Sequence, residues 1–289
     1  MKKRIVVTGA NGQLGKTIKD IFCLNAEELE CVFVGRTELD VANKDKVCQF
    51  FNNHAFDYCV NCAAFTNVDG AQDAIHEAFA INADAADFLA QACKSSNTTL
   101  IHISTDYVFD GKKCTPYTET DPTNPINVYG RSKLEGERLI QKAMAKYFII
   151  RTSWLYSQYP KNFVTTIAGK IKENADLSIV TSQRGTPTSC ESLAKFIHWL
   201  IVNENKDYGI FHFSAKGETT WHGLSLKIAE QFTDYDRKKI KAVESFKTKA
   251  QRPIYSVMDN SKVQKIYHAQ NDWSVELEKV MGQILNKLG

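Results

Sequence analysis

A tyrosine and a lysine four residues apart, Tyr129 and Lys133, form the pattern of greatest chemical interest in this chain. Residues at this spacing share one face of a helix. A free phenol, with a pKa of about 10, is a poor acid or base at neutral pH, but a nearby ammonium favours the phenolate and makes the phenol a better proton donor. Thr105 and Ser104 end an apolar run, where a hydroxyl can hydrogen-bond a carbonyl oxygen. We therefore expect a proton donor that acts on a carbonyl, with Tyr129, Lys133 and a hydroxyl of Thr105 or Ser104 as the catalytic groups.

A glycine-rich turn near the N-terminus predicts a dinucleotide site. Glycines at 9, 12 and 15 follow an apolar run at 4–8 and precede residues at helical spacing. Glycine lets the backbone approach a pyrophosphate, and the helix N-terminus supplies unpaired N–H groups. A purely structural turn is the competing interpretation. The residues expected to contact the cofactor here are Gly9, Asn11, Gly12, Gln13 and Leu14.

The ends of the second and third predicted strands supply further cofactor candidates. Arg36 suits a 2′-phosphate, so the sequence favours NADPH and leaves NADH possible. The competing interpretation is that Arg36 is an ordinary solvent-exposed charge in a loop. Glu38 could bind the ribose instead. Asp40 could accept from the adenine amine while Val41 packs on the ring. Small side chains after the third strand would let the cofactor cross the strand ends, with Ala63, Ala64, Phe65 and Thr66 as the expected contacts.

Strand-like and helix-like segments alternate through the first half of the chain. This alternation predicts an α/β fold with a Rossmann-type doubly wound parallel sheet and a smaller C-terminal substrate-binding region. We expect a dinucleotide-binding domain at 1–153 and mainly the substrate-binding region at 154–289, with room for some later segments to return to the first domain. The expected strands are 4–8, 30–34, 58–61, 99–104, 148–152 and 210–213, and the expected helices are 13–24, 44–54, 73–94, 127–146, 163–172, 191–202, 221–231 and 275–288. The proline-rich loop at 109–125 is long enough to cover a site.

Composition excludes several classes of protein. The 289 residues carry a formal charge of +3 and no basic run with interleaved aromatics, so we expect no nucleic-acid partner. No apolar run reaches the roughly 18 residues of a membrane span. Eight cysteines lie among apolar neighbours, and the pair Cys59 and Cys62 has no second pair to complete a zinc site. We expect a cytoplasmic protein that binds no metal.

Several motifs together resemble the extended short-chain dehydrogenase/reductase family over nearly the whole chain. The most specific is Ser-Thr-Asp-Tyr-Val-Phe-Asp-Gly at 104–111. The glycine trio and Tyr-x-x-x-Lys are shared more widely. Other matching stretches lie at 38–41, 61–69, 151–156, 183–188 and 252–256.

The resemblance implies specific roles. It is strongest to the family's reductases of dTDP-linked 4-keto-6-deoxy sugars, with dTDP-L-rhamnose as the implied product. Tyr129 would protonate the C4 oxygen, Lys133 would tune Tyr129 and hold the nicotinamide ribose, and Thr105 would polarise the ketone. Residues matching positions near the sugar nucleotide are Thr66, Val68, Asp106, Tyr107 and Trp154, while Arg184 lies in a loop suited to a pyrophosphate.

Two alternatives stay open from the sequence. One is another nucleotide-sugar reductase or epimerase of the same family, and the other is a non-catalytic NADP-binding regulatory subunit. Some family members form a dimer through magnesium held by glutamates. This chain offers Lys16 or Thr17, and Cys190 or Glu191, at the corresponding positions. We therefore expect a monomer or a homodimer without a bridging metal.

Overall fold

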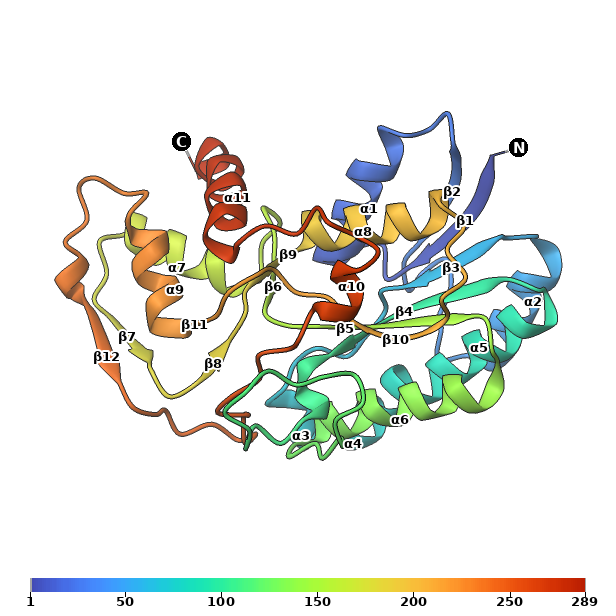
Figure 1. Ribbon diagram of the computed structural model, residues 1–289, viewed down its shortest axis with the longest axis horizontal. Helices are drawn as coiled ribbons and strands as arrows, with labels where there is room; N and C mark the ends of the chain where they lie inside the picture. Colours follow the sequence, from blue (N-terminus) through green and yellow to red (C-terminus); the bar gives the residue numbers. More distant parts are fainter. Residues whose placement is uncertain (1, 289) are drawn as a thin grey trace.

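Short apolar segments pair into one parallel sheet in the computed structural model, which describes residues 2–288. Within these residues the sheet has six strands in the order β10-β5-β4-β3-β1-β2 (Figure 1). Their bounds are β1 Lys3–Thr8, β2 Leu29–Val34, β3 Tyr58–Asn61, β4 Thr99–Thr105, β5 Tyr147–Thr152 and β10 Gly209–His212. The order places successive strands on both sides of β1, as in a doubly wound sheet. The predicted α/β fold with a parallel central sheet is confirmed.

Helices cover both faces of this sheet (Figure 1). The first face carries α1 (Gln13–Cys23) and α8 (Cys190–Val202); the second carries α2 (Lys44–Asn53), α5 (Ala85–Ser95) and α6 (Val128–Ala143). Side chains along β1 alternate between the two faces. Ile5 and Val7 join the core under α1 and α8, and Val6 joins the core under α2, α5 and α6. A strand buried on both faces needs apolar residues at successive positions, which explains the uninterrupted apolar run at 5–7.

The single helix predicted over 73–94 is wrong, because the structure breaks it into several pieces. They are α3 (Gly70–Asp73), α4 (Ile75–Phe79), the π-helical turn η1 (Ala80–Asp84) and α5. In η1, Asn82 is buried and forms hydrogen bonds with both the N–H and the C=O of Phe65. Its amide also donates to the hydroxyl of Ser132 on α6, 2.9 Å away. The wider turn therefore lets one side chain join three segments, a tertiary effect that helical periodicity does not reveal.

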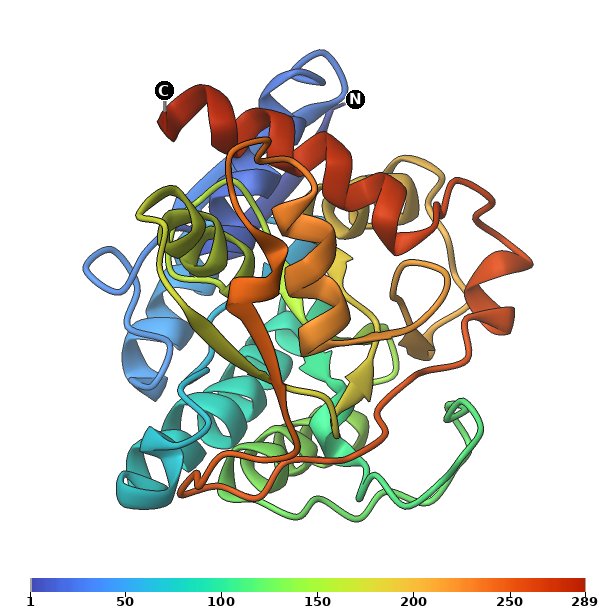
Figure 2. The same ribbon diagram turned by 90° about the vertical axis from the view of Figure 1, so that its left-hand side faces the viewer.

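The C-terminal half forms a second, smaller core beside the sheet (Figures 1 and 2). Three short strand pairs and three helices build it. The pairs are β6 (Leu155–Tyr156) with β9 (Thr188–Ser189), β7 (Leu177–Val180) with β12 (Ile240–Val243), and β8 (Arg184–Gly185) with β11 (Thr219–Thr220). The helices are α7 (Phe163–Lys172), α9 (Trp221–Ala229) and α11 (Trp273–Leu288). Residues of α8 and β10, although late in the chain, lie on the main sheet. The boundary at 153/154 stays a prediction.

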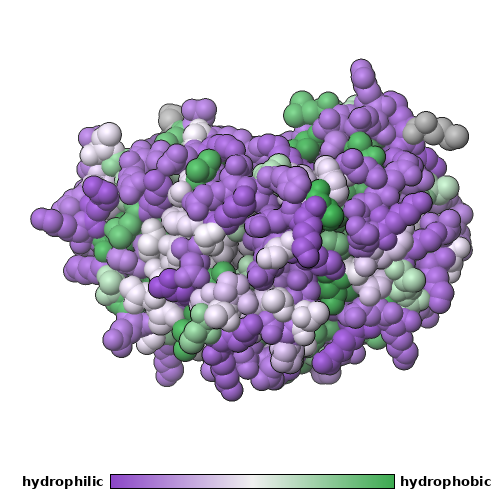
Figure 3. All heavy atoms as spheres, viewed as in Figure 1, coloured by the Kyte–Doolittle hydropathy of each residue, from purple (hydrophilic) through white to green (hydrophobic). Residues whose placement is uncertain are grey.

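Short segments complete the chain between these elements: the 3-10 turns η2 (Asp106–Val108) and η3 (Arg237–Lys239), and the helix α10 (Ser261–Gln264). Hydrophilic residues dominate the face seen in Figure 3, with paler residues toward its middle. Among the described residues, we find no helix with the length and apolar character needed to cross a bilayer.

A buried ion pair joins α6 to the sheet. Arg151 of β5 donates to Glu137 of α6 at 2.7 Å, and both side chains are almost fully buried. Ser104 of β4 donates to the same carboxylate. Since each charge is out of water, each depends on its partner for compensation.

We predict that Arg151→Ala lowers the free energy of unfolding by about 3–5 kcal/mol, because it leaves the Glu137 carboxylate buried and unpaired. Urea denaturation measures this loss. The matched control is Arg138→Ala, which removes an exposed arginine 3.6 Å from Glu135 on the same helix; it should cost at most about 1 kcal/mol. Equal losses in the two variants would contradict the importance of the buried pair.

Candidate active site

The parallel register brings the carboxyl ends of β1, β3 and β4 to one edge of the sheet. Thr8 pairs with Asn61, and Asn61 pairs with His102, so the turns that follow these strands lie side by side. A cavity of about 610 Å³ opens at this edge. The predicted site residues that line it are Gly9, Asn11, Gly12, Gln13, Leu14, Ala64, Thr66, Val68, Thr105, Asp106, Tyr107, Tyr129, Lys133 and Trp154.

The glycine turn forms the floor of this cavity. Gly9 has a φ of +63°, and a Cβ there would lie 2.6 Å from the backbone nitrogen of Ala63. Only glycine permits both that conformation and that approach. Helix α1 begins just beyond, and its N-cap residue, Gly12, supplies no side-chain hydrogen bond. The first N–H groups of α1 are therefore available to an anion at the positive end of the helix dipole.

Helix α6 presents Tyr129 and Lys133 to the opposite wall. Asn127 caps the helix by accepting a hydrogen bond from the Gly130 N–H at 2.8 Å. A Cβ on Gly130 would lie 2.2 Å from the carbonyl oxygen of Tyr107. Glycine at this position therefore lets the first turn of α6 pack directly on the segment after β4, which brings Tyr129 beside Thr105.

The phenol of Tyr129 is suited to hold a proton until it is needed. Burial raises its pKa to about 12, and a hydrogen bond with Thr105 partly opposes that rise. The phenol consequently stays protonated throughout the neutral range. Its ring meets that of Tyr107 edge to face, with the ring centroids 5.7 Å apart.

Lys133 forms its hydrogen bonds with residues of β4. Its Nζ donates to the carbonyl oxygen of Ile103 at 2.6 Å and lies 3.1 Å from Nε2 of His102. Burial lowers the pKa of Lys133 to about 8, opposed by the nearby Glu137 carboxylate. The pKa of Tyr129 is set by its burial, by the hydrogen bond with Thr105 and by the nearby carboxyl group of Asp106. In the free protein Lys133 thus holds α6 against β4, and its expected effect on the phenol of Tyr129 stays a prediction.

The two candidate hydroxyls at the end of β4 both line the cavity but have different partners. The Ser104 hydroxyl donates to the buried carboxylate of Glu137, away from the residues that a ligand would meet. The Thr105 hydroxyl accepts from the Tyr107 N–H at 3.1 Å and donates to Oδ1 of Asp106 at 3.0 Å. Thr105 is therefore the hydroxyl that can be offered to a bound carbonyl.

Asp106 is a buried carboxyl group at the cavity wall. It is 2% exposed, and its Oδ2 atom has no hydrogen-bond partner among the described residues. Burial raises the pKa of Asp106 to about 6, against hydrogen bonds from Ser256 and Thr105 that favour the charged form. The group therefore changes charge close to neutral pH.

The C-terminal region closes the cavity with aromatic side chains. Trp154 has a φ of +46°, which is unusual for a bulky residue. Its ring stacks on Trp221 with centroids 3.6 Å apart, and the Trp221 indole donates to Gln183 at 3.0 Å. A Cβ at position 185 would lie 2.6 Å from the Trp154 ring, so Gly185 leaves room for it. The two rings form a flat apolar wall suited to a sugar or a base.

Six of the predicted site residues lie outside the cavity lining: Arg36, Asp40, Val41, Ala63, Phe65 and Arg184. Arg184 pairs with Glu218 at 2.7 Å, and Val41 packs in the apolar core. Glu38 accepts from the Gly35 N–H at 2.8 Å and so shapes the turn after β2. The loop at 109–125 contributes no residue to the lining either. The cofactor and pyrophosphate contacts expected for the six residues outside the lining stay predictions.

Several residues at the site were not foreseen from the sequence. Cys62, Lys16, Lys161 and Trp221 line the cavity, and Asn82 and His102 support it from behind. His102 could have been noticed in the sequence as a polar residue within the apolar run at 99–103. Trp221 comes from a distant part of the chain, so local sequence gave no indication of its place.

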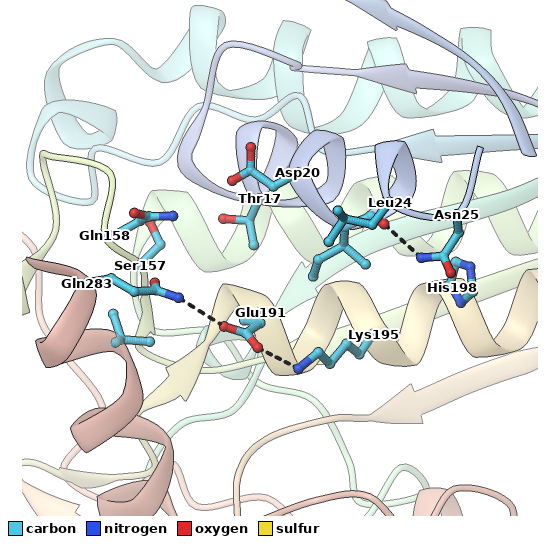
Figure 4. A pocket seen from close by; sticks show the side chains of 12 residues that line it. Thr17, Asp20, Leu24, Asn25, Ser157, Gln158, Glu191, Lys195, His198 and Gln283 are labelled. Atoms are coloured by element: carbon cyan, nitrogen blue, oxygen red, sulfur yellow. Dashed lines mark hydrogen bonds and ion pairs between the residues drawn. The ribbon is translucent and has the colours of Figure 1, made fainter.

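A second cavity, of about 440 Å³, lies away from the strand ends, between α1, α8 and α11 (Figure 4). Gln283 of α11 donates to Glu191 of α8, which also accepts from Lys195 on the same helix, and Asp20 and Thr17 lie on the facing helix α1 (Figure 4). The described part of the chain contains no group of three or more His, Cys, Asp or Glu side chains placed to hold a metal ion.

Comparison with known proteins adds an independent finding. The family model described as "RmlD substrate binding domain" matches residues 2–286. The dTDP-4-dehydrorhamnose reductase of Sinorhizobium fredii is 36% identical over 273 residues, covering 91% of each chain. That of Aggregatibacter actinomycetemcomitans is 34% identical, covering 96% of this chain and 98% of its own. A crystal structure of dTDP-4-dehydrorhamnose reductase from Bacillus anthracis in complex with NADP has a TM-score of 0.93 at 35% identity, covering 98% and 100% of the two chains.

We predict that the unfolding free energy of the Asp106→Asn variant rises relative to that of the parent as the pH rises from about 4 to 7. Because the pKa of Asp106 is raised from 3.8 to about 6, the folded protein binds this proton more tightly than the unfolded chain does. Stability is therefore lost as the pH rises through this interval, by roughly 2–3 kcal/mol in total.

Asparagine removes the ionisation and keeps the shape of the side chain. Urea denaturation of the parent and Asp106→Asn at pH 4.5 and pH 8 tests this effect. A difference in unfolding free energy between the two proteins that does not change with pH would contradict it.

Proposed function

The chain belongs to the RmlD substrate binding domain family, and on that premise we propose that it reduces a dTDP-linked 4-keto-6-deoxy sugar with NADPH. The proposed substrate is dTDP-4-dehydro-6-deoxy-L-mannose, and the product is dTDP-L-rhamnose. The names of the curated relatives and the NADP complex of the Bacillus anthracis protein support this assignment. The observation that carries it is the meeting of Tyr129, Thr105 and Lys133 in one cavity above the glycine turn.

The residues present fit a dinucleotide. The uncapped N-terminus of α1 offers N–H groups to a pyrophosphate, and Gly9 leaves space for it to come close. We expect Lys133 to bind the nicotinamide ribose, and Arg36, which follows β2, to bind the 2′-phosphate. When bound, NADPH supplies the hydride that reduces the ketone carbon.

The chain's own residues supply the proton and the polarisation. As negative charge develops on the ketone oxygen, Tyr129 donates its phenolic proton to that oxygen, which becomes the new hydroxyl. Thr105 donates a hydrogen bond to the same oxygen and so favours the charge as it forms. For this its hydroxyl turns from Asp106 to the substrate, which is easier when Asp106 is protonated and accepts more weakly.

The aromatic wall orients and shields the sugar nucleotide. Trp154 and Trp221 offer apolar faces, and Gln13 connects the two halves of the cavity by donating to the carbonyl oxygen of Leu155 at 3.2 Å. Exclusion of water by this wall strengthens the hydrogen bonds to the ketone oxygen. We also propose a cytoplasmic monomer or homodimer that acts without nucleic acid, membrane or metal.

We predict that Tyr129→Phe lowers kcat by at least about 100-fold, because the ketone oxygen loses its proton donor. Loss of reduced-nicotinamide absorbance measures turnover of the keto sugar, and quenching of protein fluorescence measures NADPH binding, which should be retained.

The matched variant is Tyr107→Phe, which removes the other phenol at the cavity. It should raise the KM for the sugar nucleotide more than it lowers kcat. Turnover by Tyr129→Phe at the parent rate would refute the proton-donor role, and binding of NADP with no turnover of any keto sugar by the parent would favour a regulatory subunit.

We predict that Arg36→Ala raises the KM for NADPH about tenfold or more and leaves the KM for NADH nearly unchanged. A charge-assisted hydrogen bond to the 2′-phosphate contributes about 1.5–3 kcal/mol, and NADH lacks this group. Steady-state kinetics with each cofactor measures the ratio. Arg138→Ala, a distant exposed arginine, serves as the control, and equal changes for both cofactors would exclude Arg36 as the phosphate ligand.

A further inference from the structure

A row of buried polar side chains crosses three adjacent strands beneath Lys133. Thr8, Asn61 and His102 lie in register on β1, β3 and β4, on the face of the sheet that α6 covers. The hydroxyl of Thr8 donates to Oδ1 of Asn61 at 2.7 Å. Nδ2 of Asn61 lies 3.0 Å from Nδ1 of His102, and Nε2 of His102 lies 3.1 Å from Nζ of Lys133. All four side chains are at most 2% exposed.

The backbone fixes the direction of this row. Oδ1 of Asn61 also accepts a hydrogen bond from the N–H of Ala63 at 3.1 Å. A backbone N–H can only donate, so the amide oxygen must face it, whereas the Thr8 hydroxyl could serve either orientation. Nδ2 of Asn61 is then the donor to His102, and Nδ1 of His102 is the acceptor. A neutral imidazole has one N–H, which must lie on Nε2.

The Nε2–H group therefore points at Lys133, where only an acceptor can satisfy it. An ammonium has three donors and no acceptor. The Nε2–H group of a neutral His102 would therefore have no acceptor if Lys133 were charged. An uncharged amine has one lone pair. It can accept from Nε2–H while it donates to the Ile103 carbonyl oxygen 2.6 Å away.

We propose that Asn61 and His102 are positioning residues that favour the uncharged amine of Lys133 over the ammonium in the free protein. This inference rests on the role proposed above for Lys133. The ammonium would form if Nζ left His102 to contact a bound ribose. Asn61 and His102 thus set the pH at which Lys133 becomes charged.

The other groups around Lys133 are compatible with an uncharged amine. The ionisable groups facing it are His102 on β4, Cys62 after β3, and Glu137 and Tyr129 on α6 itself. Glu137 favours the ammonium, but Arg151 of β5 already neutralises that carboxylate. Burial raises the pKa of Cys62 and of Tyr129, so both stay uncharged. Burial lowers the pKa of His102 well below its usual value and that of Lys133 to about 8, so His102 is neutral and Lys133 titrates close to neutrality.

The test is the substitution Asn61→Asp, which should reverse the direction of the hydrogen bonds between position 61, His102 and Lys133. A carboxylate accepts from Thr8 and Ala63 with one oxygen and from Nδ1–H of His102 with the other. The lone pair of the imidazole then lies on Nε2, where it accepts from a Lys133 ammonium. The control, Thr8→Val, removes the first hydrogen bond of the row but leaves the Ala63 N–H to orient Asn61.

Two NMR readouts on the whole, cofactor-free protein follow the change. In the parent, ¹⁵N-histidine spectra should show the Nε2–H tautomer of His102, and the Lys133 side chain should titrate near pH 8. Asn61→Asp should convert His102 to the Nδ1–H tautomer and raise the Lys133 midpoint by about one pH unit or more. Thr8→Val should change neither. The variants His102→Gln and Lys133→Arg assign the signals.

Each other outcome overturns the proposal. An Nδ1–H tautomer in the parent, a parent Lys133 midpoint near 10.5, or a tautomer unaffected by Asn61→Asp would each do so. The parent measurements decide the question even if Asn61→Asp does not fold. The negative charge of aspartate could by itself raise the Lys133 midpoint. Only reversed hydrogen bonds would also change the tautomer of His102, so the tautomer distinguishes the two effects. Because neither readout needs turnover, failure of the proposed reaction and failure of this inference are distinguishable.

Discussion

The attachment of α6 to β4 is the interaction on which the site depends. The Lys133 amine donates to the Ile103 carbonyl oxygen, and Glu137, one turn later, binds Ser104 and Arg151. These contacts fix the helix against the ends of the parallel strands. Tyr129 therefore lies beside Thr105 and above the glycine turn that follows β1. An oxyanion that forms at this place meets a proton donor and a hydroxyl without rearrangement of the backbone.

The C-terminal region completes the site rather than merely covering it. Trp154 adopts a left-handed backbone conformation that costs about 1–3 kcal/mol in a bulky residue. Stacking on Trp221 and the space left by Gly185 compensate for that cost. The strain thus lies where the two halves of the molecule meet around the cavity, as expected if the aromatic wall must face the ligand.

Much of this arrangement could be predicted from the sequence, and the exceptions have physical causes. The glycine turn, Thr105 and the Tyr129–Lys133 pair depend on local spacing, so strand and helix periodicity suffices to bring them together. The π-helical turn at Asn82 and the Trp154–Trp221 stack depend on contacts distant in sequence. The contact between Lys133 and His102 could not be predicted for a similar reason, because helical spacing shows which residues share a face but not which strand residue lies beneath them.

The central claim is that hydride and proton meet at one sugar ketone in the cavity above the glycine turn. The most direct measurement is turnover of the dTDP-linked 4-keto-6-deoxy sugar with NADPH that carries transferable deuterium at the nicotinamide C4, in ordinary water. The account predicts a product with deuterium on carbon 4 of the hexose, where it does not exchange with water. Deuterium released into water, or found at another carbon of the sugar, would contradict it.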